Sequence, residues 1–162
     1  MYRYFFVDLE NTQSRGLNGI ENLDKNDTVY IFYSENSSRL AMRTVSKVLN
    51  SKAKVILKEI VQVGENTLDY QIVALLGSLI ATNNTDLYYI ISEDKGYTAA
   101  IEILEESNFI DVGRTFLKAN INEVVTKEDE YFSKDKLIEL TLSKAQAQLC
   151  NRQLRMQKTG VQ

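Results

Sequence analysis

The chain has 162 residues, of which 44% are hydrophobic and 25% charged, and its formal net charge is −3. It contains no histidine and one cysteine, which excludes Ser-His-Asp and Cys-His triads, zinc sites built from histidine or from several cysteines, and internal disulfides. We therefore expect a globular, cytoplasmic protein with no membrane span, in which any hydrolytic chemistry depends on Asp and Glu.

Short apolar runs alternate with helical periodicity along the chain. Strands are expected at residues 3–8, 28–33, 54–63, 87–91 and 109–112. Helices are expected at about 12–23, after a cap at Asn36 or Ser37, from about Asn66 to the Asn83-Asn84 turn, and at about 97–107. This alternation predicts an α/β fold, a Rossmann-like three-layer α/β/α sandwich with a mostly parallel sheet. The expected strand order is 3-2-1-4-5, the commonest arrangement of five such strands with one reversal.

The segment after the predicted sandwich has a different pattern. From about Ser133, side chains recur in steps of four and three that predict a long helix: Ile138, Leu142, Ala145, Leu149, Arg152 and Met156. We therefore divide the chain into a domain at 1–120 and a C-terminal helical extension at 121–162. The extension is expected to pack on the domain, with contact to RNA, a second copy or another protein as the alternatives.

Two of the apolar runs end in acid. The first leads into Asp8 and the fourth leads, through Ser92 and Glu93, into Asp94. The predicted strand order places these two strand ends side by side at the switch point of the sheet. Asp69, in the first turn of the helix after the third strand, is expected at the same edge, and Glu35, just after the second strand, is a plausible fourth acid.

Several carboxylates in one crevice repel each other unless a cation compensates their charge. Mg²⁺ or Mn²⁺, as one ion or two, is the expected compensation, because these ions take oxygen ligands and suit phosphodiester hydrolysis. Each acid also has a simpler explanation. Asp8 could accept backbone N–H groups, Asp69 could favour the positive end of its helix and Asp94 could cap the next helix. Glu35 and Glu93 could be solvated loop charges.

Three segments make the chain resemble the PIN-like nucleases, including the NYN group, over about residues 3–115: Asp8-Leu9-Glu10-Asn11, Leu68-Asp69-Tyr70 and Ser92-Glu93-Asp94-Lys95-Gly96-Tyr97. The resemblance implies metal-dependent cleavage of single-stranded RNA or structured nucleic acid. It also implies that Asp8, Asp69 and Asp94 are metal ligands, with Asn11 and Ser92 supporting them. The chain departs from the NYN pattern at Gly96, where that pattern has a second Asp, so a second ion would need Glu93 or Glu35.

Nucleic acid, with RNA favoured, is the expected partner. The stretch from Lys144 to Gln162 carries bases and no Asp or Glu, so a polyanion would meet this tail more readily than the acidic body. The candidate contacts are Lys95, Lys144, Arg152 and Arg155. A homo-oligomer or a protein partner could use the C-terminal helix, and some PIN-like proteins are toxins with an antitoxin partner.

Two alternatives stay open. The run Asp8-Leu9-Glu10-Asn11-Thr12 is similar to the Asp-x-Asp-x-Thr motif of haloacid dehalogenase-like phosphatases, in which Asp8 would be the nucleophile, but Glu10 stands where that family has its acid/base Asp. The other alternative is a catalytically weak or inactive PIN-like module that binds RNA or protein.

Overall fold

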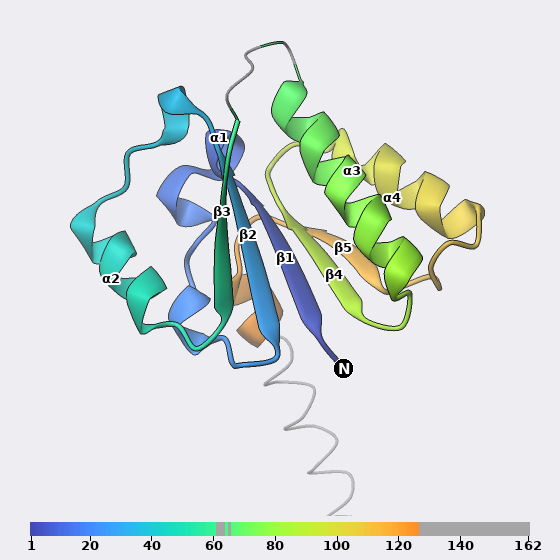
Figure 1. Ribbon diagram of the computed structural model, residues 1–162, viewed down its shortest axis with the longest axis horizontal. Coiled ribbons are helices and arrows are strands. Elements are labelled where there is room, and N and C mark those ends of the chain that lie inside the picture. Colours follow the sequence, from blue (N-terminus) through green and yellow to red (C-terminus); the bar gives the residue numbers. More distant parts are fainter. Residues whose placement is uncertain (61–63, 65, 127–162) are drawn as a thin grey trace, which may run out of the picture. The chain divides into compact units, whose positions relative to one another are not determined.

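The structure, a computed structural model, describes residues 1–60, 64 and 66–126. In this part of the chain five parallel strands form one sheet in the order β3-β2-β1-β4-β5 (Figure 1). The strands are β1 (Arg3–Asp8), β2 (Asp27–Tyr33), β3 (Lys54–Glu59), β4 (Leu87–Ile91) and β5 (Thr115–Lys118). The predicted fold class and the order 3-2-1-4-5 are confirmed.

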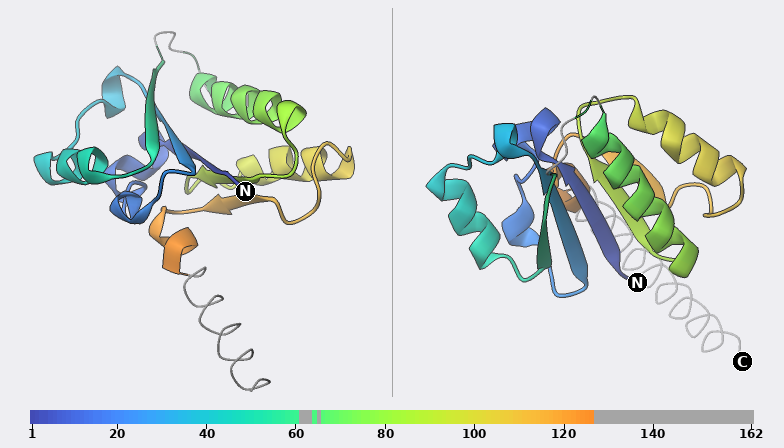
Figure 2. Two further views of the ribbon diagram at one scale, coloured as in Figure 1. Left: turned by 60° about the horizontal axis from the view of Figure 1, so that its bottom comes forward. Right: turned by 45° about the horizontal axis from the view of Figure 1, so that its top comes forward.

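Helices cover both faces of the sheet (Figure 2). They are α1 (Leu9–Thr12), α2 (Met42–Asn50), α3 (Thr67–Thr82) and α4 (Tyr97–Glu106), with short 3₁₀ turns at Gln13–Arg15, Ile20–Asn22 and Glu35–Ser37. Elements α1 and α2 pack on one face, and α3 and α4 pack on the other. Within the described residues, no helix has the length and apolar character needed to cross a membrane.

The central strand β1 shows how the core determines where its last side chain points. Successive residues of a strand face opposite sides of the sheet. Phe5 and Val7 accordingly pack with Leu17 on the α1 side, whereas Phe6 packs with Ile72 on the α3 side. Asp8 continues the series of Phe6, so its carboxylate is directed to the α3 and α4 side.

The helix predicted at 12–23 is wrong. The chain there forms the short α1 and two 3₁₀ turns, because the backbone has a positive φ at Gln13 (52°) and at Gly19 (96°) and cannot continue a helix. The helix predicted after Asn36 or Ser37 begins later, at Met42. Ser34 and Ser37 cap each other around a 3₁₀ turn instead.

The fifth strand was predicted too early, at 109–112. Asn108 and Gly113 both have positive φ and bend the chain on either side of that stretch, in which Phe109 and Val112 are 59% and 81% exposed. The strand forms only after the Gly113 turn. The third strand ends at Glu59, and the predicted continuation at 61–63 lies outside the described residues.

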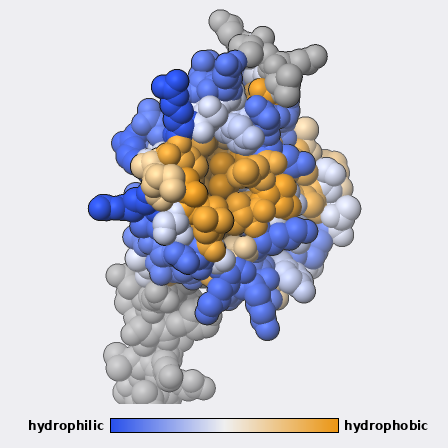
Figure 3. Space-filling view, turned by 60° about the vertical axis from the view of Figure 1, so that its left-hand side comes forward, coloured by the Kyte–Doolittle hydropathy of each residue, from blue (hydrophilic) through white to orange (hydrophobic). Residues whose placement is uncertain are grey.

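An apolar surface lies over α2 and the edge strand β3 (Figure 3). Met42 and Leu49 are 80% and 78% exposed on α2, and Leu57 is 62% exposed on β3. Within the described helix α2 no residue is buried, although its apolar side chains share one side.

Residues 1–125 form one compact unit. From residue 127 on, the predicted C-terminal extension, with Lys144, Arg152 and Arg155, lies outside the described residues, and the boundary at residue 120 stays a prediction.

Candidate active site

Asp8 is fully buried where β1 passes into α1. Its Oδ1 accepts the backbone N–H of Asn11 at 3.1 Å. Its Oδ2 accepts Asn11 Nδ2 at 2.6 Å and the hydroxyl of Ser92 at 3.0 Å. Both carboxylate oxygens are therefore held by protein donors, and the structure brings the two predicted supporting residues directly to Asp8.

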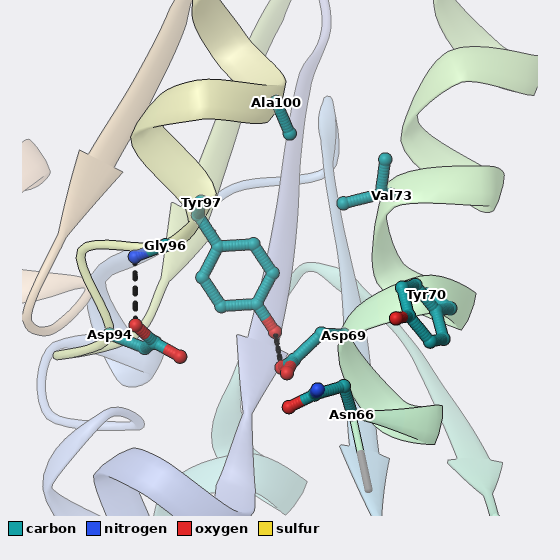
Figure 4. A pocket seen from close by; sticks show the side chains of 8 residues that line it. All are labelled: Asn66, Asp69, Tyr70, Val73, Asp94, Gly96, Tyr97 and Ala100. Carbon is teal, nitrogen blue, oxygen red and sulfur yellow. Dashed lines mark hydrogen bonds between the residues drawn. The ribbon is translucent and has the colours of Figure 1, made fainter.

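Tyr97 links Asp8 to Asp69. The Tyr97 hydroxyl, at the start of α4, lies 2.6 Å from Asp69 Oδ1 and 3.3 Å from Asp8 Oδ2, and Figure 4 shows it pointing at Asp69. Burial, followed by the negative charges of Asp8 and Asp69, raises the pKa of Tyr97. The hydroxyl therefore stays protonated and acts as the hydrogen-bond donor to both acids. The shorter hydrogen bond, to Asp69, is the stronger one.

Asp69 lies in the first turn of α3 and is half-buried. Burial raises the pKa of its carboxyl, and the negative charges of Asp8, Asp94 and Glu10 raise it further, against the hydrogen bond from Tyr97. The geometry agrees with these contributions, because Asp69, Asp94 and Glu10 line one cavity and the Tyr97 hydroxyl bridges Asp69 and Asp8.

Asp94 is exposed and is positioned by its own loop. Its backbone N–H donates to the Ser92 hydroxyl at 3.1 Å, so Ser92 connects the Asp94 loop to the Asp8 carboxylate. Asp94 Oδ1 accepts the backbone N–H of Gly96 at 2.8 Å. A Cβ at residue 96 would lie 3.2 Å from that oxygen. Gly96, where the NYN pattern has an acid, thus supplies an amide that orients Asp94.

Glu10 is a site residue that was not predicted from the sequence. With Asp69 and Asp94 it lines a cavity of about 370 Å³, and its carboxylate accepts a hydrogen bond from the Ser34 hydroxyl at the end of β2. The described residues around this cavity include three acids and no Lys or Arg. A signal for Glu10 was present, since it follows Asp8 by two residues at the same strand end.

The family of this chain follows from a comparison with models of known protein families. A model of the PIN domain matches residues 2–111, which is more than half of the chain and includes all four acids. The chain belongs to the PIN domain family. PIN domains are generally nucleases, so the fold of this chain is of a nuclease type. Comparison with curated proteins and with solved structures gives no match.

The remaining predicted residues of this PIN domain do not line the cavity. Glu35 is exposed and does not line either cavity that contains Asp69. Glu93 lies 3.4 Å from Arg15 in an exposed ion pair. Lys95 is exposed in the Asp94 loop. Tyr97 was missed as a site residue although it follows Asp94 by three residues, because its role depends on side-chain direction.

The fit of a metal ion can be judged from these donors. In the part of the PIN domain that the structure describes, no three Asp, Glu or Cys side chains form a ready metal cluster. Asp8 has both oxygens occupied by hydrogen bonds, whereas Asp69, Asp94 and Glu10 share a cavity whose described lining contains no Lys or Arg. PIN domains typically use divalent metals. Carboxylate oxygens around a polar cavity suit Mg²⁺ or Mn²⁺ that keeps some of its water ligands, rather than an ion enclosed entirely by protein ligands.

Proposed function

We propose that this protein is a metal-dependent nuclease that hydrolyses phosphodiester bonds, with single-stranded or structured RNA as the favoured substrate. The observation that carries the proposal is the cavity lined by Asp69, Asp94 and Glu10, with no Lys or Arg among its described lining residues, next to a buried Asp8 that Tyr97 links to Asp69. Crowded carboxylates raise the free energy of the folded protein unless positive charge is present. Divalent ions that bind together with a phosphodiester substrate would supply that charge.

The roles of the residues follow from how each is held. Asp69 and Asp94 would be ligands of Mg²⁺ or Mn²⁺, because both residues line the cavity. Asp8 has four donors on its carboxylate and no exposed surface, so it would join the ligand set only by exchanging one of those bonds. When bound, the ion would activate water and stabilise the leaving oxygen.

A second ion, if bound, needs a further acid. Glu10 suits that role better than Glu35 or Glu93, because Glu10 lines the cavity and its carboxylate is oriented by Ser34. Glu93 is engaged with Arg15 on the surface. We retain Lys95 and, in the C-terminal extension, Lys144, Arg152 and Arg155 as proposed contacts to the nucleic acid.

The binding-module alternative has an observation in its favour, because the described residues form no ready three-ligand cluster. The phosphatase alternative has none. Asp8 would be its nucleophile, yet Asp8 is fully buried with both oxygens hydrogen-bonded. A carboxylate in that state cannot approach a phosphate monoester without rearrangement.

The test is cleavage of end-labelled single-stranded RNA, hairpin RNA and single-stranded DNA by the full chain with Mg²⁺, with Mn²⁺ and with EDTA. We expect metal-dependent cleavage of RNA that Asp94→Asn abolishes. The matched control is Asp111→Asn, since the Asp111 side chain is 82% exposed in another part of the unit. Salt-sensitive RNA binding without cleavage in either metal would replace the nuclease with the binding module.

A further inference from the structure

A second cavity adjoins the acids on their other side. It has a volume of about 410 Å³ and lies between α3 and α4, and Figure 4 shows its lining. Val73, Ala100 and the ring of Tyr97 give it apolar walls, while Asp69 and Asp94 belong both to this cavity and to the polar one. The volume falls within the roughly 300–1,000 Å³ of small-ligand pockets, and apolar walls with a few polar groups are typical of such pockets.

Tyr70 is the most unusual side chain at this cavity. It follows Asp69 in the first turn of α3 and is 69% exposed, whereas Tyr97 on the facing helix is 3% exposed. An aromatic ring held at the rim of an apolar cavity, one residue from an acid of the site, gains little from the protein core. Such a ring offers its face to a planar partner, and base-on-aromatic stacking is the common way in which proteins hold unpaired bases.

Asn66 adds a polar group at the same rim. Its backbone is left-handed (φ 61°) at the start of α3, and its side chain makes no capping hydrogen bond to that helix. An amide has both a donor and an acceptor, which matches the hydrogen-bonding edge of a nucleobase. The cavity thus combines apolar walls, an exposed ring and an amide beside the acids.

We propose that the cavity between α3 and α4 binds one unpaired nucleobase of the substrate, stacked on Tyr70, and so directs the adjoining phosphate toward the site of the proposed metal ligands Asp69 and Asp94. This inference rests on the proposed nuclease function and names its substrate class as single-stranded nucleic acid. A base that is paired in a duplex cannot enter the cavity unless it is extruded first. Tyr70 is therefore a positioning residue for the substrate and does not take part in the chemical step.

The test uses the full chain and a single-stranded RNA carrying one fluorescent adenine analogue, whose emission is quenched when it stacks on an aromatic ring. With Ca²⁺ in place of Mg²⁺ and Mn²⁺, we expect quenching by the wild type and by Tyr70→Phe, and little by Tyr70→Ala. Under cleavage conditions, we expect Tyr70→Ala to raise KM about 5- to 100-fold, in line with the loss of one stacked base, while kcat changes little.

Tyr2→Ala is the matched control. Tyr2 is 54% exposed and precedes β1, so it lies at the end of this strand opposite to Asp8 and the acidic site. Its removal is therefore expected to leave quenching and KM unchanged. Wild-type cleavage with an unchanged KM and unchanged quenching in Tyr70→Ala would overturn the base site while leaving the nuclease in place. Quenching that depends on Tyr70 without cleavage in any metal would support the base site and overturn the nuclease.

Discussion

The Tyr97 hydroxyl joins two acids that come from different parts of the chain. It is 2.6 Å from Asp69 and 3.3 Å from Asp8, and the residue is 3% exposed. Tyr97→Phe keeps the ring but removes the donor, so Asp69 loses a charge-assisted hydrogen bond worth roughly 1.5–3 kcal/mol. We expect the free energy of unfolding to fall by about this amount in urea titrations without metal. Tyr70→Phe, which removes an exposed hydroxyl, should leave the midpoint unchanged, and equal midpoints for both variants would contradict the role of Tyr97.

The charge on Asp69 gives the metal-free protein a pH-dependent cost. Burial raises the pKa of this carboxyl above its ordinary 3.8, so the folded state holds the proton more tightly than the unfolded state does. The cost is absent below the ordinary pKa, grows as pH rises through the raised pKa and is constant above it.

Asp69→Asn removes that cost. In EDTA we therefore expect the Tm of the variant relative to wild type to increase as the pH rises above the ordinary pKa of 3.8 and to level off above the raised pKa. Differential scanning fluorimetry across this range measures the difference. The exposed Asp111→Asn serves as the control and should show no such trend. A difference for Asp69→Asn that is independent of pH would show that the charge of Asp69 is not what destabilises the site.

At the scale of elements, the sequence predicts best where a pattern is repeated over several turns. Helix α3 lies close to its predicted place, because Leu68, Ile72 and Leu76 recur at helical spacing and are all buried against the sheet. The failures lie where contacts distant in sequence decide the backbone. Gly19 lies directly beside the backbone of Asn122, which is about 100 residues further along the chain, and no local sequence pattern predicts that contact.

The same distinction applies to the site. Asp8, Asp69 and Asp94 could be brought to one edge from topology alone, since parallel strands end where the following helices begin. Which way a side chain points within a loop depends on its partners. Glu10 is turned into the cavity by Ser34, whereas Glu93 is engaged by Arg15, and neither interaction is visible in a linear pattern.

Gly19 provides a test of that long-range contact. Its φ is +96°, and an added Cβ would lie 2.7 Å from the backbone nitrogen of Asn122, so Gly19→Ala introduces both backbone strain and a clash. We expect a loss of at least roughly 1–3 kcal/mol in the free energy of unfolding. Gly77→Ala is the opposite case, because the site lies inside α3 and, apart from the adjacent backbone of that helix, no described atom lies within 4 Å of the new Cβ. That variant should gain about 0.5–1 kcal/mol, and a Gly19→Ala protein as stable as wild type would refute the contact.

At the scale of the whole molecule, the acidic site exists only in the folded chain. Asp8 ends β1, Asp69 lies in the first turn of α3 and Asp94 follows β4, so unfolding separates all three. A ligand that binds the folded state alone stabilises it by RT ln(1 + [L]/Kd), about 2.7 kcal/mol at a concentration 100 times Kd. Mg²⁺ or Mn²⁺ should therefore raise the Tm even when no substrate is present.

The variants make this thermal shift specific to the site. We expect the rise in Tm with Mg²⁺ or Mn²⁺ in the wild type and in Asp111→Asn, and its loss in Asp94→Asn, measured against KCl at matched ionic strength to remove general screening. Asp94 is exposed, so the substitution leaves the core intact and the metal-free protein should be no less stable than wild type. An equal metal response in wild type and in Asp94→Asn would mean that the ion binds elsewhere, and the shared carboxylate site would have to be abandoned. A shift that also disappears in Asp69→Asn would show that residues from α3 and from the loop after β4 bind one ion together.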